Sequence, residues 1–188
     1  MGVILDIVYS FIIRAMIVLI VLTAMVNLND SLFRQTERVA LNDLVLGAAE
    51  TIDNDFTLAG YGPSTSKVFA KADSIEAIFS ADIDNDGTTE TVRYHLGSGA
   101  SGSHRILYRT LNAGTDLEIA RDVILLRFNY YSKTGTALSG TTVSGIKSIK
   151  ISMTIESNHD LNSIYSGTSE TSSFQKATWE RQYFPENL

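Results

Sequence analysis

The chain has 188 residues, which is room for one globular domain and an appendage. It carries 21 acidic and 15 basic side chains, and the resulting net charge of -6 argues against a protein that binds the phosphate backbone of nucleic acid. Cysteine is absent, which excludes a disulfide framework, a thiolate metal site and haem attached through cysteine.

Residues 1–28 are predicted to form an apolar helix. Between Ala15 and Val26 only Thr23 is polar, and about 20 mostly apolar residues are enough for a helix to span a bilayer. A secretory signal peptide would end at a small-residue cleavage site, whereas this segment runs on into more helical pattern. We therefore expect a single membrane-spanning segment that stays with the chain.

Residues 29–59 are predicted to continue this helix in amphipathic form, with one apolar face among charged residues. That face comprises Leu28, Leu32, Val39, Leu41, Leu44, Val45, Ala48, Ala49 and Ile52. We expect the helix to run unbroken from Gly2 to about Asp55. Gly60, Gly62 and Pro63 then supply the chemistry of a helix stop.

Residues 60–188 are predicted to form a β-rich head, because short apolar runs alternate with Gly, Ser, Thr, Asn and Asp clusters. The clearest strand is 149–156, where apolar and polar residues alternate. A second expected row consists of Ile124, Leu126, Phe128 and Tyr130. Such strands need a cover, and the amphipathic half-helix is the obvious one. The expected fold is α+β: a long N-terminal helix, apolar and then amphipathic, packed on an antiparallel β-sheet head.

Two charges interrupt the apolar helix, Asp6 and Arg14. Each would cost about 2.5 to 3.5 kcal/mol at the centre of a bilayer, so each needs a reason to be there. One reading is that the side chains reach the membrane edge. Another starts from Gly2, because a small second residue normally allows removal of Met1, which would make Gly2 the first residue and Asp6 the fifth.

The segment GVILDIVYSF, residues 2–11, resembles the start of the type IV pilins and pseudopilins. In that family a carboxylate at the fifth position is thought to neutralise the N-terminal amine of the adjacent subunit. The resemblance implies that Gly2 and Asp6 act in assembly, with Asp6 in place of the family's glutamate. Arg14 is included in the expected assembly set, either as a second partner for a carboxylate or facing lipid phosphate before assembly.

Later segments resemble the W-type minor pilins and related pseudopilins. ETIDNDFTLAGYG (50–62) is similar to their helix end, and FSADIDNDGTTETVRYHL (79–96) to their first hairpin. ILYRTL (106–111), VILLRFNYYSKTG (123–135) and the final FPENL resemble the strands and closing segment that follow. The order of these pieces carries the resemblance, because each piece alone is degenerate.

An acidic loop lies inside the expected first hairpin. Asp82, Asp84 and Asp86 precede Gly87 with the spacing at which carboxylates converge on calcium, and Glu90 follows. The twelfth position is Arg93 instead of glutamate, so this is not a complete EF-hand. Two readings stay open: a tight turn with solvated aspartates, or a calcium-stabilised loop. No other cofactor is expected.

Catalysis finds little support in the sequence. His95 is expected on a strand, and His104 and His159 in loops, all with surface roles and without metal-ligand partners at useful spacing. We therefore expect that the protein is not an enzyme.

The functional expectation is a structural subunit of an extracellular type IV pilus-like filament, reached through a single-pass precursor in the cytoplasmic membrane. Its partners would be copies of itself or other pilins, and the pilus assembly machinery. The alternative is a membrane-tethered extracytoplasmic binding protein, with the Ser- and Thr-rich segments 135–145 and 157–173 as its recognition surface.

Overall fold

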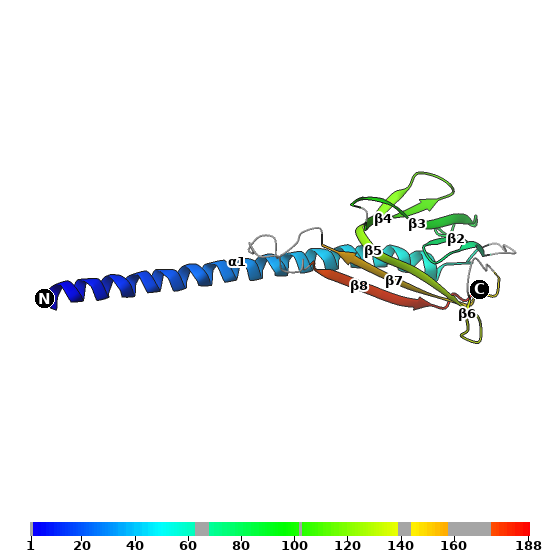
Figure 1. The fold of residues 1–188 in the computed structure, drawn as a ribbon. Helices are drawn as coiled ribbons and strands as arrows, with labels where there is room; N and C mark the ends of the chain where they lie inside the picture. Colours follow the sequence, from blue (N-terminus) through cyan, green and yellow to red (C-terminus); the bar gives the residue numbers. More distant parts are fainter. Residues whose placement is uncertain (1, 63–67, 102, 139–143, 158–173) are drawn as a thin grey trace. The chain divides into compact units, whose positions relative to one another are not determined.

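The computed structural model describes residues 2–62, 68–101, 103–138, 144–157 and 174–188. Helix α1 spans Gly2–Thr57 without interruption, and the described residues after it form eight strands (Figure 1). The chain divides into two compact units, Met1–Val39 and Ala40–Leu188, so α1 contributes to both. The long helix followed by antiparallel strands confirms the α+β fold expected from the sequence.

The first unit consists of α1 as far as Val39, and it contains the apolar part of the helix. An 18-residue window within Asp6–Thr57 has a mean hydropathy of 2.4 and no buried residue, so α1 is long and apolar enough to cross a membrane. Thr23 satisfies its hydroxyl within the helix, because its Oγ1 donates to the carbonyl oxygen of Leu19 at 2.9 Å. Arg34 and Asp30 form an ion pair one turn apart at 2.9 Å.

The second unit contains one antiparallel sheet. Its strands are paired in the order β1-β2-β3-β4-β5-β7-β8, with β6 added alongside β5. The strands are β1 (Phe69–Ala72), β2 (Glu76–Ala81), β3 (Glu90–Ser101), β4 (His104–Leu111), β5 (Leu117–Tyr131), β6 (Ala137–Leu138), β7 (Ser148–Glu156) and β8 (Lys176–Tyr183). Among the described strands β1 and β8 are therefore the two edges of the sheet.

Strand β7 has the alternation that the sequence predicts, but the expected row on β5 is partly wrong. In β7 the apolar side chains of Ile149 to Ile155 are buried. In β5 Leu126, Phe128 and Tyr130 are buried, whereas Ile124 is only half-buried and Val123 takes the inward position. The register with β7 shifts between Val123 and Leu125, so a bulge reverses the side-chain alternation there.

The last turns of α1 form one wall of the head's core. Val45, Ala48, Ala49 and Ile52 of the predicted apolar face are buried, and Phe56 extends this buried face by one turn. Leu28, Leu32 and Val39 were predicted on the same face but are 59% to 64% exposed, so the part of α1 that covers the sheet is shorter than predicted. Figure 1 shows this cyan end of the helix lying against the strands. The ring of Phe56 contacts four others on four strands, at centroid distances of 4.7 Å (Phe79), 5.5 Å (Tyr94), 5.8 Å (Phe128) and 5.9 Å (Tyr183).

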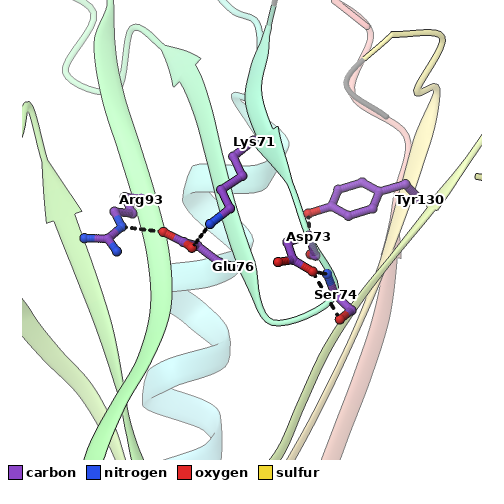
Figure 2. Close-up of polar contacts among 6 residues, drawn as sticks. All are labelled: Lys71, Asp73, Ser74, Glu76, Arg93 and Tyr130. Carbon is purple, nitrogen blue, oxygen red and sulfur yellow. Dashed lines mark hydrogen bonds and ion pairs between the residues drawn. The ribbon is translucent and has the colours of Figure 1, made fainter. Parts of the chain in front are cut away.

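The turn between β1 and β2 is hydrogen-bonded to β5, and Figure 2 shows the Tyr130 hydroxyl at Asp73 in this turn. The backbone N–H of Phe128 on β5 donates to the carbonyl oxygen of Ser74 at 2.8 Å, and the hydroxyl of Tyr130 donates to that of Asp73 at 3.2 Å. In the sheet β3 and β4 lie between β2 and β5, so these bonds join strands that are not neighbours. The sheet must therefore curve to bring the turn onto β5.

Glu76 ties three strand positions together beside this turn (Figure 2). Its carboxylate pairs with Lys71 on β1 and with Arg93 on β3, the latter at 2.7 Å. Burial raises the pKa of Glu76, but the hydrogen bonds from Lys71 and Arg93 outweigh it and leave the pKa below its ordinary value of 4.5. The folded head therefore holds this carboxylate charged more strongly than the unfolded chain does.

Replacing Phe56 by alanine is expected to lower the free energy of unfolding of the head by about 3 to 5 kcal/mol, because a large buried ring leaves a cavity. The measurement is urea unfolding of the full chain in detergent, followed by the fluorescence of Trp179, the single tryptophan. Phe184→Ala is the matched control, because that ring is 70% exposed. Equal losses in both variants would contradict the packing described.

With Glu76 replaced by glutamine, the head is expected to lose less stability in acid than the native head does. A carboxyl group whose pKa is lower in the folded state stabilises the fold above its unfolded pKa, and this stabilisation is lost as the pH falls through the folded pKa. Glutamine does not titrate, so between about pH 5 and pH 3 the unfolding midpoint of Glu76→Gln should fall less than that of the native chain. Glu186→Gln, at an exposed acid, should behave like the native chain.

Candidate functional sites

The first candidate site is the charged start of α1. Asp6 and Arg14 both lie on the helix of the first unit with exposed side chains. Among the described residues neither has an ion-pair partner, and eight positions separate them along one helix. Gly2 begins α1 with open space where a Cβ would stand. The structure therefore places the predicted assembly residues on one helix but does not bring them together.

The surroundings of these charges are apolar in every direction around the helix. Seven consecutive side chains from Met16 to Leu22 are each between 54% and 67% exposed, and successive residues point about 100° apart. A soluble helix would show a polar face here. This part of α1 is built for apolar surroundings, either lipid or other helices.

The second candidate site is the acidic loop between β2 and β3. Asp82, Asp84 and Asp86 each place a carboxylate oxygen within 4.8 Å of the others. Glu90, the fourth predicted ligand, is outside this group of three, and its Oε2 accepts a hydrogen bond from the backbone N–H of Ile83 at 2.9 Å. Three carboxylates are suitable ligands for a hard cation such as calcium.

The same carboxylates also close the loop on themselves. Asp82, only 3% exposed, accepts backbone N–H bonds from Asp86 and Gly87, each at 3.1 Å. Asp86 accepts from the N–H and the hydroxyl of Thr88, and these bonds lower its pKa. Asn85 (φ 59°) and Gly87 (φ 88°) adopt left-handed backbone, in agreement with the expected turn chemistry. Calcium binding stays a prediction from the sequence.

The loop is attached to the exit of α1. The N–H of Asp82 donates to the carbonyl oxygen of Tyr61 at 2.8 Å, and the hydroxyl of Tyr61 donates to Asn85 at 3.2 Å. Gly62 has φ 112°, and a Cβ there would lie 2.8 Å from that of Asp82. Glycine is therefore required at this crossing, and any ordering of the loop would also order the helix exit.

A buried polar cluster at the end of α1 was not anticipated from the sequence. Asp55, 2% exposed, accepts two hydrogen bonds from Arg109 on β4, at 2.5 and 2.9 Å, and one from the hydroxyl of Tyr94 on β3 at 2.6 Å. Burial and the adjacent carboxylate raise the pKa of Tyr94 well above 10, so its hydroxyl stays a donor. Every group in the cluster is matched, which is typical of a structural clamp.

The surface roles expected for the histidines are wrong for two of them. The His95 side chain on β3 is 15% exposed, with Nε2 3.4 Å from Asp116. His104 opens β4 instead of lying in a loop; its side chain is 11% exposed, with Nε2 3.2 Å from Glu156. His159 lies outside the described residues. In the part of the chain that the structure describes, no cluster of three metal-ligating side chains includes a histidine.

Replacing Asp82 by alanine is expected to lower the free energy of unfolding of the head by about 1 to 3 kcal/mol, because the N–H groups of Asp86 and Gly87 lose a charged acceptor. Asp84→Ala is the matched control, since Asp84 is exposed and accepts one N–H bond at 3.2 Å. The same unfolding midpoints measured with calcium and with EDTA test the ion: bound calcium would raise the midpoint of the native chain and of neither variant. A loop closed by N–H donors alone gives one midpoint in both buffers.

Comparison with known proteins adds no identification: no protein-family model and no curated protein matches this sequence. A long apolar N-terminal helix is compatible with a pilin-like or a membrane-anchored protein, and it indicates membrane association or a signal sequence.

Proposed function

We propose that this chain is a structural subunit of an extracellular type IV pilus-like filament, assembled through α1. The observation that carries the proposal is the first unit, where apolar side chains face outward all around a helix that continues into the core of a folded head. Such a helix can lie in a bilayer as a single-pass precursor and later bury the same surface against other helices.

The charge at Asp6 favours a bundle of helices over lipid alone. A carboxylate within an apolar segment is costly unless a cation is supplied next to it. In the proposed filament Asp6 accepts from the N-terminal amine of a neighbouring subunit. The partners are thus copies of this chain or other pilins, together with an assembly machinery that takes the precursor from the cytoplasmic membrane to the cell surface.

The head acts in this proposal as a folded surface, not as a catalyst. Its polar groups near the helix end, at Asp55, Arg109 and Tyr94, form hydrogen bonds with one another. The net charge of -6 gives no support to a nucleic-acid partner. What the filament presents is therefore the outer face of the sheet and its loops.

The test is electron microscopy and intact-mass analysis of material sheared from cells that express the full chain with its own assembly machinery. We expect filaments from the native chain, an approximately tenfold or greater loss in Asp6→Ala, and filaments from Asp6→Glu, which keeps a carboxylate. Asp43→Ala removes an exposed acid elsewhere on α1 and should assemble normally.

The opposite outcome supports the alternative function. If the native chain is recovered only as detergent-soluble monomers, and Asp6→Ala changes neither their amount nor their location, then α1 is an ordinary anchor. The protein would then be a membrane-tethered extracytoplasmic binding protein. The segments named as its recognition surface lie partly, at 139–143 and 158–173, outside the described residues.

A further inference from the structure

The apolar segment of α1 contains one charge of each sign. Between Val3 and Leu28 the charged side chains are Asp6 and Arg14, so the segment is neutral as a whole. Both side chains are exposed, and among the described residues neither forms an ion pair. In apolar surroundings each charge is expensive by itself, whereas a matched pair offsets most of that cost.

The two charges cannot satisfy each other within one helix. Eight residues separate them, which is about 12 Å along the axis and about 80° around it. Ion pairs within a helix form between residues three or four apart, as Asp30 and Arg34 do in this helix. The partner of each charge must therefore come from outside the helix.

We propose that Arg14 of one copy pairs with Asp6 of a second copy that lies parallel to it and is displaced by eight residues, about 12 Å, along the helix axis. The occupant of this surface is a second copy because the helix is complementary to itself at that displacement. The inference rests on the proposed filament function and adds a specific stagger to it.

The pairing propagates without closing. Asp6 of the first chain pairs with Arg14 of a copy that is displaced by eight residues toward the N-terminal end. Arg14 of the first chain pairs with Asp6 of another copy, displaced by eight residues toward the C-terminal end. Each helix then has both charges matched by two different neighbours. A head-to-tail contact of this kind generates an open helical assembly and not a closed dimer.

Pairing with Arg14 is compatible with pairing to an N-terminal amine. The amine at Gly2 would meet Asp6 of a neighbour displaced by four residues, about 6 Å, in the opposite direction. The two cations would therefore come from different neighbours, and the two carboxylate oxygens can accept from both. The amine lies at Gly2 only if Met1 is removed, whereas Arg14 carries its charge whether or not Met1 is removed.

The test exchanges the two charges in the full chain, expressed with its assembly machinery. Asp6→Arg alone and Arg14→Asp alone should each lower filament yield by about tenfold or more, because each leaves like charges facing one another. The double variant restores opposite charges at the same displacement, so its yield should rise severalfold above that of both single variants; it should stay below that of the native chain, because the exchange also removes the carboxylate opposite the amine. An N-terminal amine cannot explain that recovery, since it would face Arg at position 6. Arg38→Gln, at an exposed arginine outside the apolar segment, is the matched control.

A cross-link measures the stagger directly in filaments of native charge. At an eight-residue displacement position 10 of one copy is level with position 18 of the next, and the chain has no cysteine of its own. Ser10→Cys combined with Val18→Cys should therefore give a ladder of covalent oligomers on oxidation, and either single variant should give no more than dimers. The abundance of each variant in the membrane fraction establishes that it was inserted.

Other outcomes overturn the inference and leave the filament intact. If Arg14→Gln assembles normally while Asp6→Asn does not, and the exchanged chain fails, then Asp6 is matched by the amine alone. If Arg14→Gln lowers the amount of precursor in the membrane but not the yield per precursor, Arg14 serves lipid phosphate. Recovery of monomers alone from the native chain would overturn the proposed function itself, and the stagger with it.

Discussion

The burial of one carboxylate is the constraint on which the junction of helix and sheet depends. Asp55 lies where α1 meets the sheet, and its two oxygens are held by Arg109 and Tyr94, which are directly opposite one another on β4 and β3. Removing one partner of such a cluster leaves a buried charge, which costs about 3 to 5 kcal/mol. The next residue, Phe56, enters the ring cluster of the core. The polar bonds thus fix the rotation and depth at which the apolar face of the helix is inserted.

Much of this fold could be predicted from the sequence because its two periodicities are strong. The helical spacing from Val45 to Ile52 and the strict alternation in 149–156 each identify a buried face from local residues alone. The bulge near Ile124 could not be predicted in this way, because it depends on how β5 pairs with β7. The curl of the sheet likewise depends on a bond between Ser74 and Phe128, which are far apart in the sequence.

The candidate sites also differ in whether the sequence gives a local signal for them. Asp6 and Arg14 stand out because a charge in an apolar run needs an explanation, and the acidic loop stands out by its spacing. The cluster at Asp55 gives no such local signal, since its partners are 39 and 54 residues away and only the strand register aligns them. The low exposure of His95 and His104 likewise gives no local signal, because each lies beside a carboxylate that only the tertiary structure brings near.

The exposed edge of the sheet at β8 affects how closely two heads can approach without their sheets joining. Among the described strands β8 pairs with β7 alone, so one side of its backbone can template a foreign strand. Its side chains include Lys176, Glu180 and Arg181, all exposed, and charged residues along an edge discourage fusion of one sheet with the next. Any folded domain that accumulates at high local density faces this hazard. The charges on β8 would let heads stand close together while keeping their sheets separate and avoiding amyloid-like aggregation.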